Sequence, residues 1–133
     1  EIIDGDREIF PGLNVRKTDG FSRGHQVVII RSESERAVYL GSVVPTVLHL
    51  NRVCIPAFAR HRELAEKEKQ EVLAEAIAER WLMIFPWEAK TPAGYVQEVR
   101  GDSEGSGRTL RFVPVDLRPR PTDRLVQMGV NGH

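Results

Sequence analysis

The sequence has 133 residues, with 19 lysine and arginine side chains, 19 aspartate and glutamate side chains, and a formal net charge of zero. This length fits one domain, and a neutral chain has no overall field that attracts nucleic acid or an anionic membrane. The single cysteine, Cys54, excludes an internal disulfide bond, and no apolar run is long enough for a signal-peptide core or a membrane span. These features predict a cytoplasmic protein that binds neither nucleic acid nor membrane.

The first part of the chain has the pattern of short strands. Residues 8–15 are largely apolar and are interrupted by Pro11-Gly12, a pair that favours a turn, so they predict two brief strands around a tight connection. Residues 26–31 and 36–40 are rich in β-branched and aromatic side chains and predict an antiparallel pair. Residues 45–56 are bounded by prolines and predict a helical turn followed by an irregular loop.

Residues 62–80 predict an amphipathic helix, because apolar side chains recur at helical spacing among charged ones. The predicted apolar stripe comprises Leu64, Val72, Leu73, Ala76 and Ile77. The side chains expected to face water are Glu63, Lys67, Lys69, Glu71 and Glu75. This helix is therefore expected to cover one face of the strands.

The chain after the helix again favours strands. Residues 81–85 are continuously apolar and stop at a proline, which predicts a buried strand. Residues 94–100 and 109–115 are separated by a polar, glycine-rich loop and predict a hairpin. Residues 118–133 have the composition of a tail, with a short helix predicted at 122–128.

These elements predict an open α/β layer spanning residues 1–117, followed by an extension at 118–133. One helix covers only one face of a sheet, so the other face is expected to be apolar and to need a cover. The sequence begins at Glu1 without a methionine, and its first residues have the pattern of a strand approach. We therefore expect a piece of a longer arrangement.

Four segments, residues 11–13, 18–26, 38–42 and 84–88, resemble consecutive signatures of the metallo-β-lactamase superfamily in their order and spacing. The resemblance implies the C-terminal half of that family's αββα sandwich. Such a half has an α/β fold, in which a mostly antiparallel mixed sheet carries a helix on one face. The resemblance also implies relatives that are metal-dependent hydrolases using zinc or another divalent metal.

The family's metal ligands are replaced in this chain. The family loop that resembles residues 18–25 reads Gly-His-Ser/Thr-x-Gly-His, and its first histidine, a metal ligand, corresponds to Phe21. The family's Gly-Asp, whose aspartate bridges two metal ions, corresponds to Gly41-Ser42, and the last histidine ligand corresponds to Trp87. Ala59 is a fourth such position, where relatives carry an aspartate near the metals.

The other family ligands form a His-x-His-x-Asp-His string in the N-terminal half, and this string does not occur in the sequence. A catalytic zinc ion needs three protein ligands and an open position. Phe21, Ser42 and Trp87 supply at most one weak oxygen. We therefore expect no metal, no cofactor and no catalytic residue, although the hydrolase relatives leave the question of enzyme activity open.

The remaining histidines are His25, His49, His61 and His133, and their spacing matches no ligand pattern. His25, at a strand start, is expected to make a local hydrogen bond. His49 is either a surface residue or, with His25, part of a pocket retained from the family. His61 is expected to face solvent, and Cys54 to be a core residue rather than a nucleophile.

Two functional hypotheses follow. In the first, the chain is a non-catalytic, metal-free half of the fold, engineered or degenerate, which forms a homodimer through the sheet face of the former active site. The ligand positions are replaced while the motif residues around them are retained. This pattern favours engineering or selection over random loss of function. In the second hypothesis, the chain is a fragment or subunit of a metal-dependent hydrolase of ester, lactone or lactam type. It would then need an N-terminal half-domain from another chain.

Overall fold

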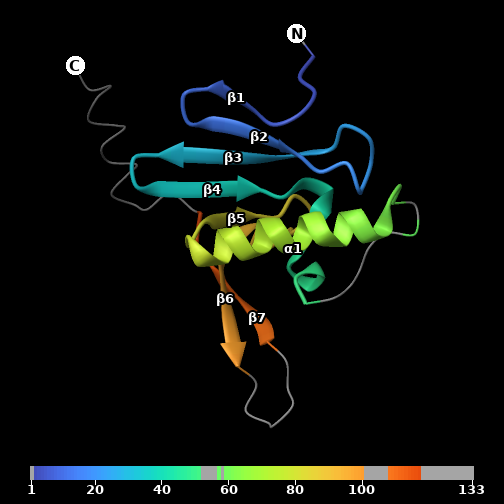
Figure 1. The fold of residues 1–133 in the computed structure, drawn as a ribbon. Coiled ribbons are helices and arrows are strands. Elements are labelled where there is room, and N and C mark those ends of the chain that lie inside the picture. The colour runs from blue at the N-terminus through green and yellow to red at the C-terminus, as the bar shows by residue number, and fades with distance from the viewer. Residues whose placement is uncertain (1, 52–56, 58, 101–107, 118–133) are drawn as a thin grey trace, which may run out of the picture.

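The computed structural model describes residues 2–51, 57, 59–100 and 108–117. Seven strands form one sheet whose spatial order follows the chain, β1 to β7 (Figure 1). The strands are β1 (Arg7–Phe10), β2 (Leu13–Lys17), β3 (Gln26–Ser32), β4 (Glu35–Tyr39), β5 (Leu82–Ile84), β6 (Ala93–Arg100) and β7 (Arg108–Pro114). The helices are η1 (Gly41–Val43), η2 (Val47–His49) and α1 (Arg62–Ala78).

The sheet is mixed but mostly antiparallel, as predicted. Every neighbouring pair runs antiparallel except β4 and β5, which are parallel because α1 lies between them in the sequence. The predicted hairpins are confirmed as β1–β2, β3–β4 and β6–β7. The helical turn expected within residues 45–56 is η2, whereas residues 52–56, the 101–107 loop and the 118–133 extension lie outside the described residues.

The β1–β2 turn depends on Gly12. Its φ of +85° is strained for other residues, and a Cβ there would lie 2.5 Å from the carbonyl oxygen of Arg31. The N–H of Arg31 donates to the carbonyl of Gly12 at 2.7 Å, so the turn is fastened to β3. The Pro11-Gly12 pair thus fixes both the hairpin and its position on the neighbouring strand.

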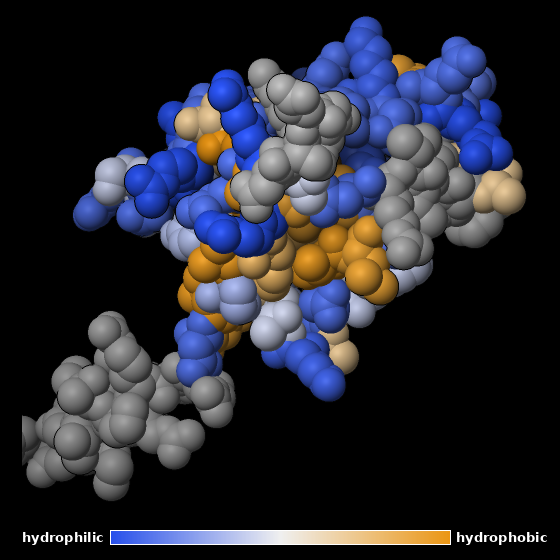
Figure 2. Space-filling view, turned by 90° about the horizontal axis from the view of Figure 1, so that it is seen from below, coloured by the Kyte–Doolittle hydropathy of each residue, from blue (hydrophilic) through white to orange (hydrophobic). Residues whose placement is uncertain are grey.

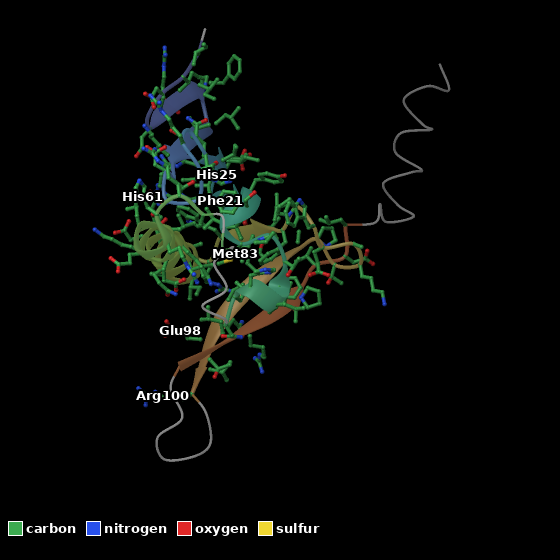
Figure 3. The ribbon with its side chains drawn as sticks, turned by 90° about the vertical axis from the view of Figure 1, so that its right-hand side faces the viewer. Phe21, His25, His61, Met83, Glu98 and Arg100 are labelled. Atoms are coloured by element: carbon green, nitrogen blue, oxygen red, sulfur yellow. The ribbon has the colours of Figure 1, made fainter. Side chains whose placement is uncertain are left out.

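The core lies between α1 and one face of the sheet. Its side chains belong to β3, β4, β5, β6, the flanks of β5, the segment 40–50 after β4 and the inner side of α1. The buried members include Val27, Ile29, Val38, Met83, Val96, Trp81, Phe85, Val72, Leu73 and Ala76. Figure 1 shows α1 lying across this face, and Figure 3, from the side, shows the helix on one side of the strands only.

Two expectations about α1 were wrong. Lys69, expected to face water, is 1% exposed, and Leu64, expected in the core, is 39% exposed. The buried residues Ala65, Lys69, Val72, Leu73 and Ala76 form one helical stripe, so Lys69 occupies a core-facing position despite its charge. The helix also ends at Ala78 instead of residue 80. Rotation of a helix about its axis is set by what it packs against, and polarity alone did not predict it.

The opposite face of the sheet carries two apolar rows across neighbouring strands. One row pairs Val15 with Val28, Tyr39, Ile84 and then Ala93, in that order from β2 to β6. The second pairs Phe10 with Leu13, Ile30, Ala37 and then Leu82, from β1 to β5. We call this surface the open face. Ile30 and Tyr39, near its centre, are each 40% exposed, whereas Val15 and Ala93, at the two ends of the first row, are buried.

The open face confirms the prediction of a sheet covered by a helix on one side only. In the sheet, these residues alternate with the core residues beneath α1, so they point away from the helix. Figure 2, seen from below Figure 1, shows apolar surface in the middle of that side of the molecule and does not look directly onto the open face. Among the described residues, no helix has the length and apolar character needed to span a membrane.

Candidate functional site

The residues that the motif resemblance equates with family metal ligands lie at one edge of the sheet. Strands β2, β4 and β5 run in the same direction, so their carboxyl ends meet at this edge. Phe21 follows β2, Ser42 follows β4 and Trp87 follows β5. We call this region the strand-end edge. The strand-end edge is distinct from the open face, which lies on the flat of the sheet. The sequence-based hypothesis placed the former active site and the packing surface on one sheet face, whereas the structure separates the two.

The loop between β2 and β3 is closed by its own hydrogen bonds. The Thr18 N–H donates to the His25 carbonyl at 2.8 Å, and the His25 N–H donates to the Ser22 carbonyl at 3.1 Å. The Gly24 N–H donates to an Asp19 carboxylate oxygen at 2.8 Å. This bond, followed by the bond from Lys17, lowers the pKa of Asp19. The loop therefore has a defined shape without any ligand.

The same loop is fastened to the start of α1. The Gly20 N–H donates to Glu68 at 2.9 Å, and the His61 N–H donates to the Gly20 carbonyl at 2.9 Å. Burial raises the pKa of Glu68, with the hydrogen bond from Gly20 opposing this effect. A Cβ on Gly20 would lie 2.2 Å from the backbone nitrogen of Ala65, so only glycine permits this approach. The helix and the loop thus form one rigid unit.

Ala59 lies next to this unit. The Arg60 N–H donates to the Phe21 carbonyl at 3.1 Å, which places the residue after Ala59 against the Phe21 backbone. Ala59 itself is buried. The structure therefore brings the segments of Ala59 and Phe21 together.

His25 joins two parts of the strand-end edge. Its Nε2 accepts the Ser42 N–H at 3.0 Å, and its Nδ1 lies 2.6 Å from Thr18 Oγ1. Because Nε2 must be an acceptor, the neutral ring carries its proton on Nδ1 and donates it to Thr18. Burial lowers the pKa of His25, which favours this neutral form. The bond to Thr18, seven residues away, is the local hydrogen bond expected for His25, and the bond from Ser42 is an additional one across 17 residues.

Phe21 and Gly41 confine the His25 ring. The Phe21 and His25 ring centroids are 5.4 Å apart at a tilt of 55°, and Figure 3 shows the two side chains next to each other. Gly41 has a φ of +56°, and a Cβ there would lie 2.9 Å from His25 Nε2. A glycine before Ser42 therefore leaves room for the imidazole to reach the Ser42 N–H.

Trp87 belongs to the strand-end edge but does not fill a cavity there. Its side chain is 68% exposed. The backbone N–H of Trp87 donates to the Pro45 carbonyl at 3.0 Å. The Glu88 carboxylate accepts the backbone N–H of Val47 at 3.2 Å. These bonds join the segment after β5 to η2. Phe21 therefore packs on His25, whereas Trp87 faces solvent.

The other histidines do not converge on His25. His49 is half-buried on η2, where its Nδ1 lies 2.7 Å from Thr46 Oγ1. His61 is exposed on the helix side, as expected, whereas Cys54 and His133 lie outside the described residues. A cavity of about 640 Å³ lies elsewhere, between residues 90–92 and 114–117.

The donors at the strand-end edge do not fit a zinc ion. Neither the phenyl ring of Phe21 nor the indole of Trp87 offers a lone pair, and both nitrogens of His25 already have hydrogen-bond partners. Within residues 2–51, 57, 59–100 and 108–117, no three His, Cys, Asp or Glu side chains form a group that could hold a metal. The hydrogen bonds at this edge connect the β2–β3 loop to the segment after β4 and to α1.

Sequence reasoning did not single out Thr18, Gly20 or Glu68 as functional positions. Thr18 is almost fully buried, and its hydroxyl oxygen accepts the hydrogen bond from His25 Nδ1, while the Gly20 N–H donates to Glu68 across 48 residues. A signal existed for Gly20, because glycine precedes the metal-binding histidine in the family motif. Glu68 had none, since its partner is distant in the sequence.

No family model and no curated protein matches this chain. Solved structures do match. A probable metal-dependent hydrolase from Staphylococcus aureus is 24% identical, with a TM-score of 0.66 over 70% of this chain and 34% of that chain. AidC, a dizinc quorum-quenching lactonase, is 12% identical, with a TM-score of 0.67 over 90% of this chain and 39% of that chain.

AbOPH, a hydrolase in the β-lactamase superfamily, is 16% identical, with a TM-score of 0.65 over 84% of this chain and 37% of that chain. At these identities the likeness is one of fold. The chain thus spans between 34% and 39% of the length of these three proteins. The structure is therefore half of a β-lactamase-type α/β sandwich, as the motif resemblance implied.

Proposed function

We propose, from the half-sandwich fold shared with metal-dependent hydrolases of the β-lactamase superfamily, that this chain is a non-catalytic structural module, a pseudoenzyme half. Its function is to pack the open face against a second sheet. The observation that supports the proposal is the pair of apolar rows, which cross β1 to β6 without a helix over them. Contiguous apolar patches of this kind mark interaction surfaces.

The strand-end edge supports the non-catalytic part of the proposal. Phe21 and Trp87 offer no metal-binding lone pair, and His25 serves as a connector between Thr18 and Ser42. A hydrolase of the family type needs several ligands and an activated water at this place. Whether the replacements arose by design or by loss of function does not affect the proposed role.

The coverage of the solved structures favours a second candidate function. Because the chain spans about a third of their length, it would be a fragment that completes a metal-dependent hydrolase of ester, lactone or lactam type with an N-terminal half-domain. In such an assembly the complementary half would supply the metal ligands. The open face would be the docking surface here too.

Metal content and hydrolysis test the non-catalytic role. We expect purified chain, dialysed against zinc, manganese or iron and then against metal-free buffer, to retain far less than one ion per chain. It should show no metal-dependent hydrolysis of model esters and lactones. Stoichiometric metal together with metal-dependent turnover would contradict the proposal. Hydrolysis that appears only with a complementary half-domain would favour the second candidate.

Tyrosine nitration tests the cover of the open face. The chain has two tyrosines, Tyr39 and Tyr95, and both alternate with core residues and so belong to the open face. If a second sheet covers this face, Tyr39 should be nitrated much more slowly in the native protein than in urea-unfolded protein. If the native rate matches that of a half-exposed phenol, the proposed cover is wrong.

A further inference from the structure

The outer edge of β7 is one end of the sheet. Strand β7 pairs with β6 on one side and has no neighbouring strand on the other side within the part of the chain that the structure describes. Figure 1 shows the β6–β7 hairpin extending away from the rest of the sheet. An outer strand presents backbone N–H and C=O groups that can pair with a strand of another chain. Thr109, Phe112 and Val113 are residue types that favour such pairing.

The register of the hairpin determines which backbone groups of β7 face outward. The Val115 N–H donates to the Ala93 carbonyl at 2.9 Å, so the backbone groups of Val115 face β6. Successive residues of a strand direct these groups to opposite sides. Counted back from Val115, every second residue therefore bonds β6, and the residues between them face outward. Leu110, in the middle of β7, is one of the outward-facing residues.

Asn51 occupies the outward-facing groups of Leu110. The Leu110 N–H donates to Asn51 Oδ1 at 2.7 Å, and Asn51 Nδ2 donates to the Leu110 carbonyl at 2.7 Å. Two residues of a hydrogen-bonded pair in an antiparallel sheet exchange the same two bonds. The side-chain amide of Asn51 thus takes the place of a residue in a next strand. A strand that paired along β7 would have to displace it.

The segment before Asn51 holds its amide in this position. Leu50 is 4% exposed in the core, and its N–H donates to the Val47 carbonyl at 3.1 Å. The Val47 N–H in turn donates to the Glu88 carboxylate at 3.2 Å. Asn51 itself is exposed and lies 59 residues from Leu110 in the sequence. The fold therefore brings a surface amide to the one strand whose outer side it can cap.

We infer that the outer edge of β7 is a masked strand-pairing site, and that Asn51 keeps it from pairing with a second chain. Pro114 adds to the protection, because it also lies at an outward-facing position and has no N–H to donate. The inference goes beyond the proposed function. It concerns an edge of the sheet and does not depend on what covers the open face.

The occupant of the unmasked edge is the same edge of a second copy. In a purified sample, each chain from which Asn51 has been removed offers an identical β7. An antiparallel, two-fold pairing centred on Leu110 places Leu110 opposite its own copy and Thr109 opposite Arg111. Arg111 then faces no like charge across the pair, so this register is free of the repulsion that opposes many self-pairings.

Hydrogen exchange and light scattering on Asn51→Ala test the inference. At low protein concentration, the Leu110 amide should exchange about tenfold or more faster than in the native chain, because it loses its acceptor. Pairing in the native chain must first break two bonds in each copy, whereas pairing in the variant breaks none. Self-association, measured by light scattering over a range of concentrations, should therefore be about tenfold or more stronger in Asn51→Ala.

Three further variants make the test specific. Asn51→Ser keeps a polar side chain that is too short to bond both groups, so it should behave like Asn51→Ala. Adding Leu110→Pro to Asn51→Ala should restore the native mass, since proline removes the outward N–H and is tolerated on outer strands. Gln97→Ala is the matched control. Its exposed amide accepts from the Arg111 side chain at 3.1 Å and not from the β7 backbone, so neither exchange at Leu110 nor the mass should change.

Three results would overturn the inference. Unchanged exchange at Leu110 in both Asn51 variants would mean that Asn51 does not mask the edge. Faster exchange without stronger association would mean that the exposed edge does not pair. Stronger association that Leu110→Pro leaves in place would assign the contact to another surface. Faster exchange, stronger association and its reversal by Leu110→Pro together support the inference.

Discussion

Replacing His25 by alanine tests whether the strand-end edge is a structural connector. The imidazole accepts the Ser42 N–H and donates to Thr18, so it ties the β2–β3 loop to the segment after β4. His25→Ala removes both bonds and the contact with the Phe21 ring.

The expected loss follows from these contacts. Each hydrogen bond contributes about 0.5–1.5 kcal/mol net, and a buried N–H left without an acceptor costs about 1–3 kcal/mol. Because these groups are only partly buried, water can partly replace the ring, and we expect a total near the lower end, about 2–3 kcal/mol. In urea this corresponds to a midpoint lower by about 1 M or more.

Urea unfolding followed by circular dichroism is the assay, with His61→Ala as the matched control. His61 is the same residue type, exposed, and its side chain does not cap α1, so its removal should change the unfolding free energy by less than about 0.5 kcal/mol. If His25→Ala is no more destabilising than His61→Ala, the hydrogen bonds of His25 do not hold the edge together, and the reasoning fails.

Two further predictions concern the same edge. Burial lowers the pKa of His25 below its ordinary value of 6.5, so the stabilisation by His25 should be complete above pH 6.5 and decline as the pH falls below it. The difference in unfolding free energy between the native chain and His25→Ala should therefore shrink on acidification. A difference that stays constant would contradict this prediction. In metal-free buffer, Phe21→His should destabilise the chain by about 1 kcal/mol, since Phe21 packs on His25. Trp87→His should change stability by less than about 0.5 kcal/mol, because Trp87 is exposed. Equal costs in urea unfolding would refute this distinction.

The hairpins and the mixed sheet could be predicted from the sequence because their signals are local. Alternation of apolar side chains marks strands, and Pro11-Gly12 marks the first turn, where Gly12 adopts a positive φ against Arg31. The β3–β4 connection is only slightly tighter than expected, with Glu33 in the left-handed region. The correspondence of Phe21, Ser42 and Trp87 to family ligand positions stays a prediction from the motifs.

Other features required the tertiary structure, because they depend on partners far away in the sequence. Lys69 is buried because the orientation of α1 is set by what it packs against, including the close approach of Gly20 to Ala65. The role of His25 depends on Ser42, which a different strand brings within reach.

The largest difference concerns the surface of the former active site. From the sequence by itself, the resemblance predicted that Phe21, Ser42 and Trp87 stand where the family has metal ligands, and the side chains of Phe21 and Trp87 have no lone pair to offer a metal. Only the tertiary structure decided that these positions lie at the strand ends, whereas the apolar rows lie on the flat of the sheet. The physical reason is that strand pairing, which aligns residues from distant segments, determines which side chains share a surface.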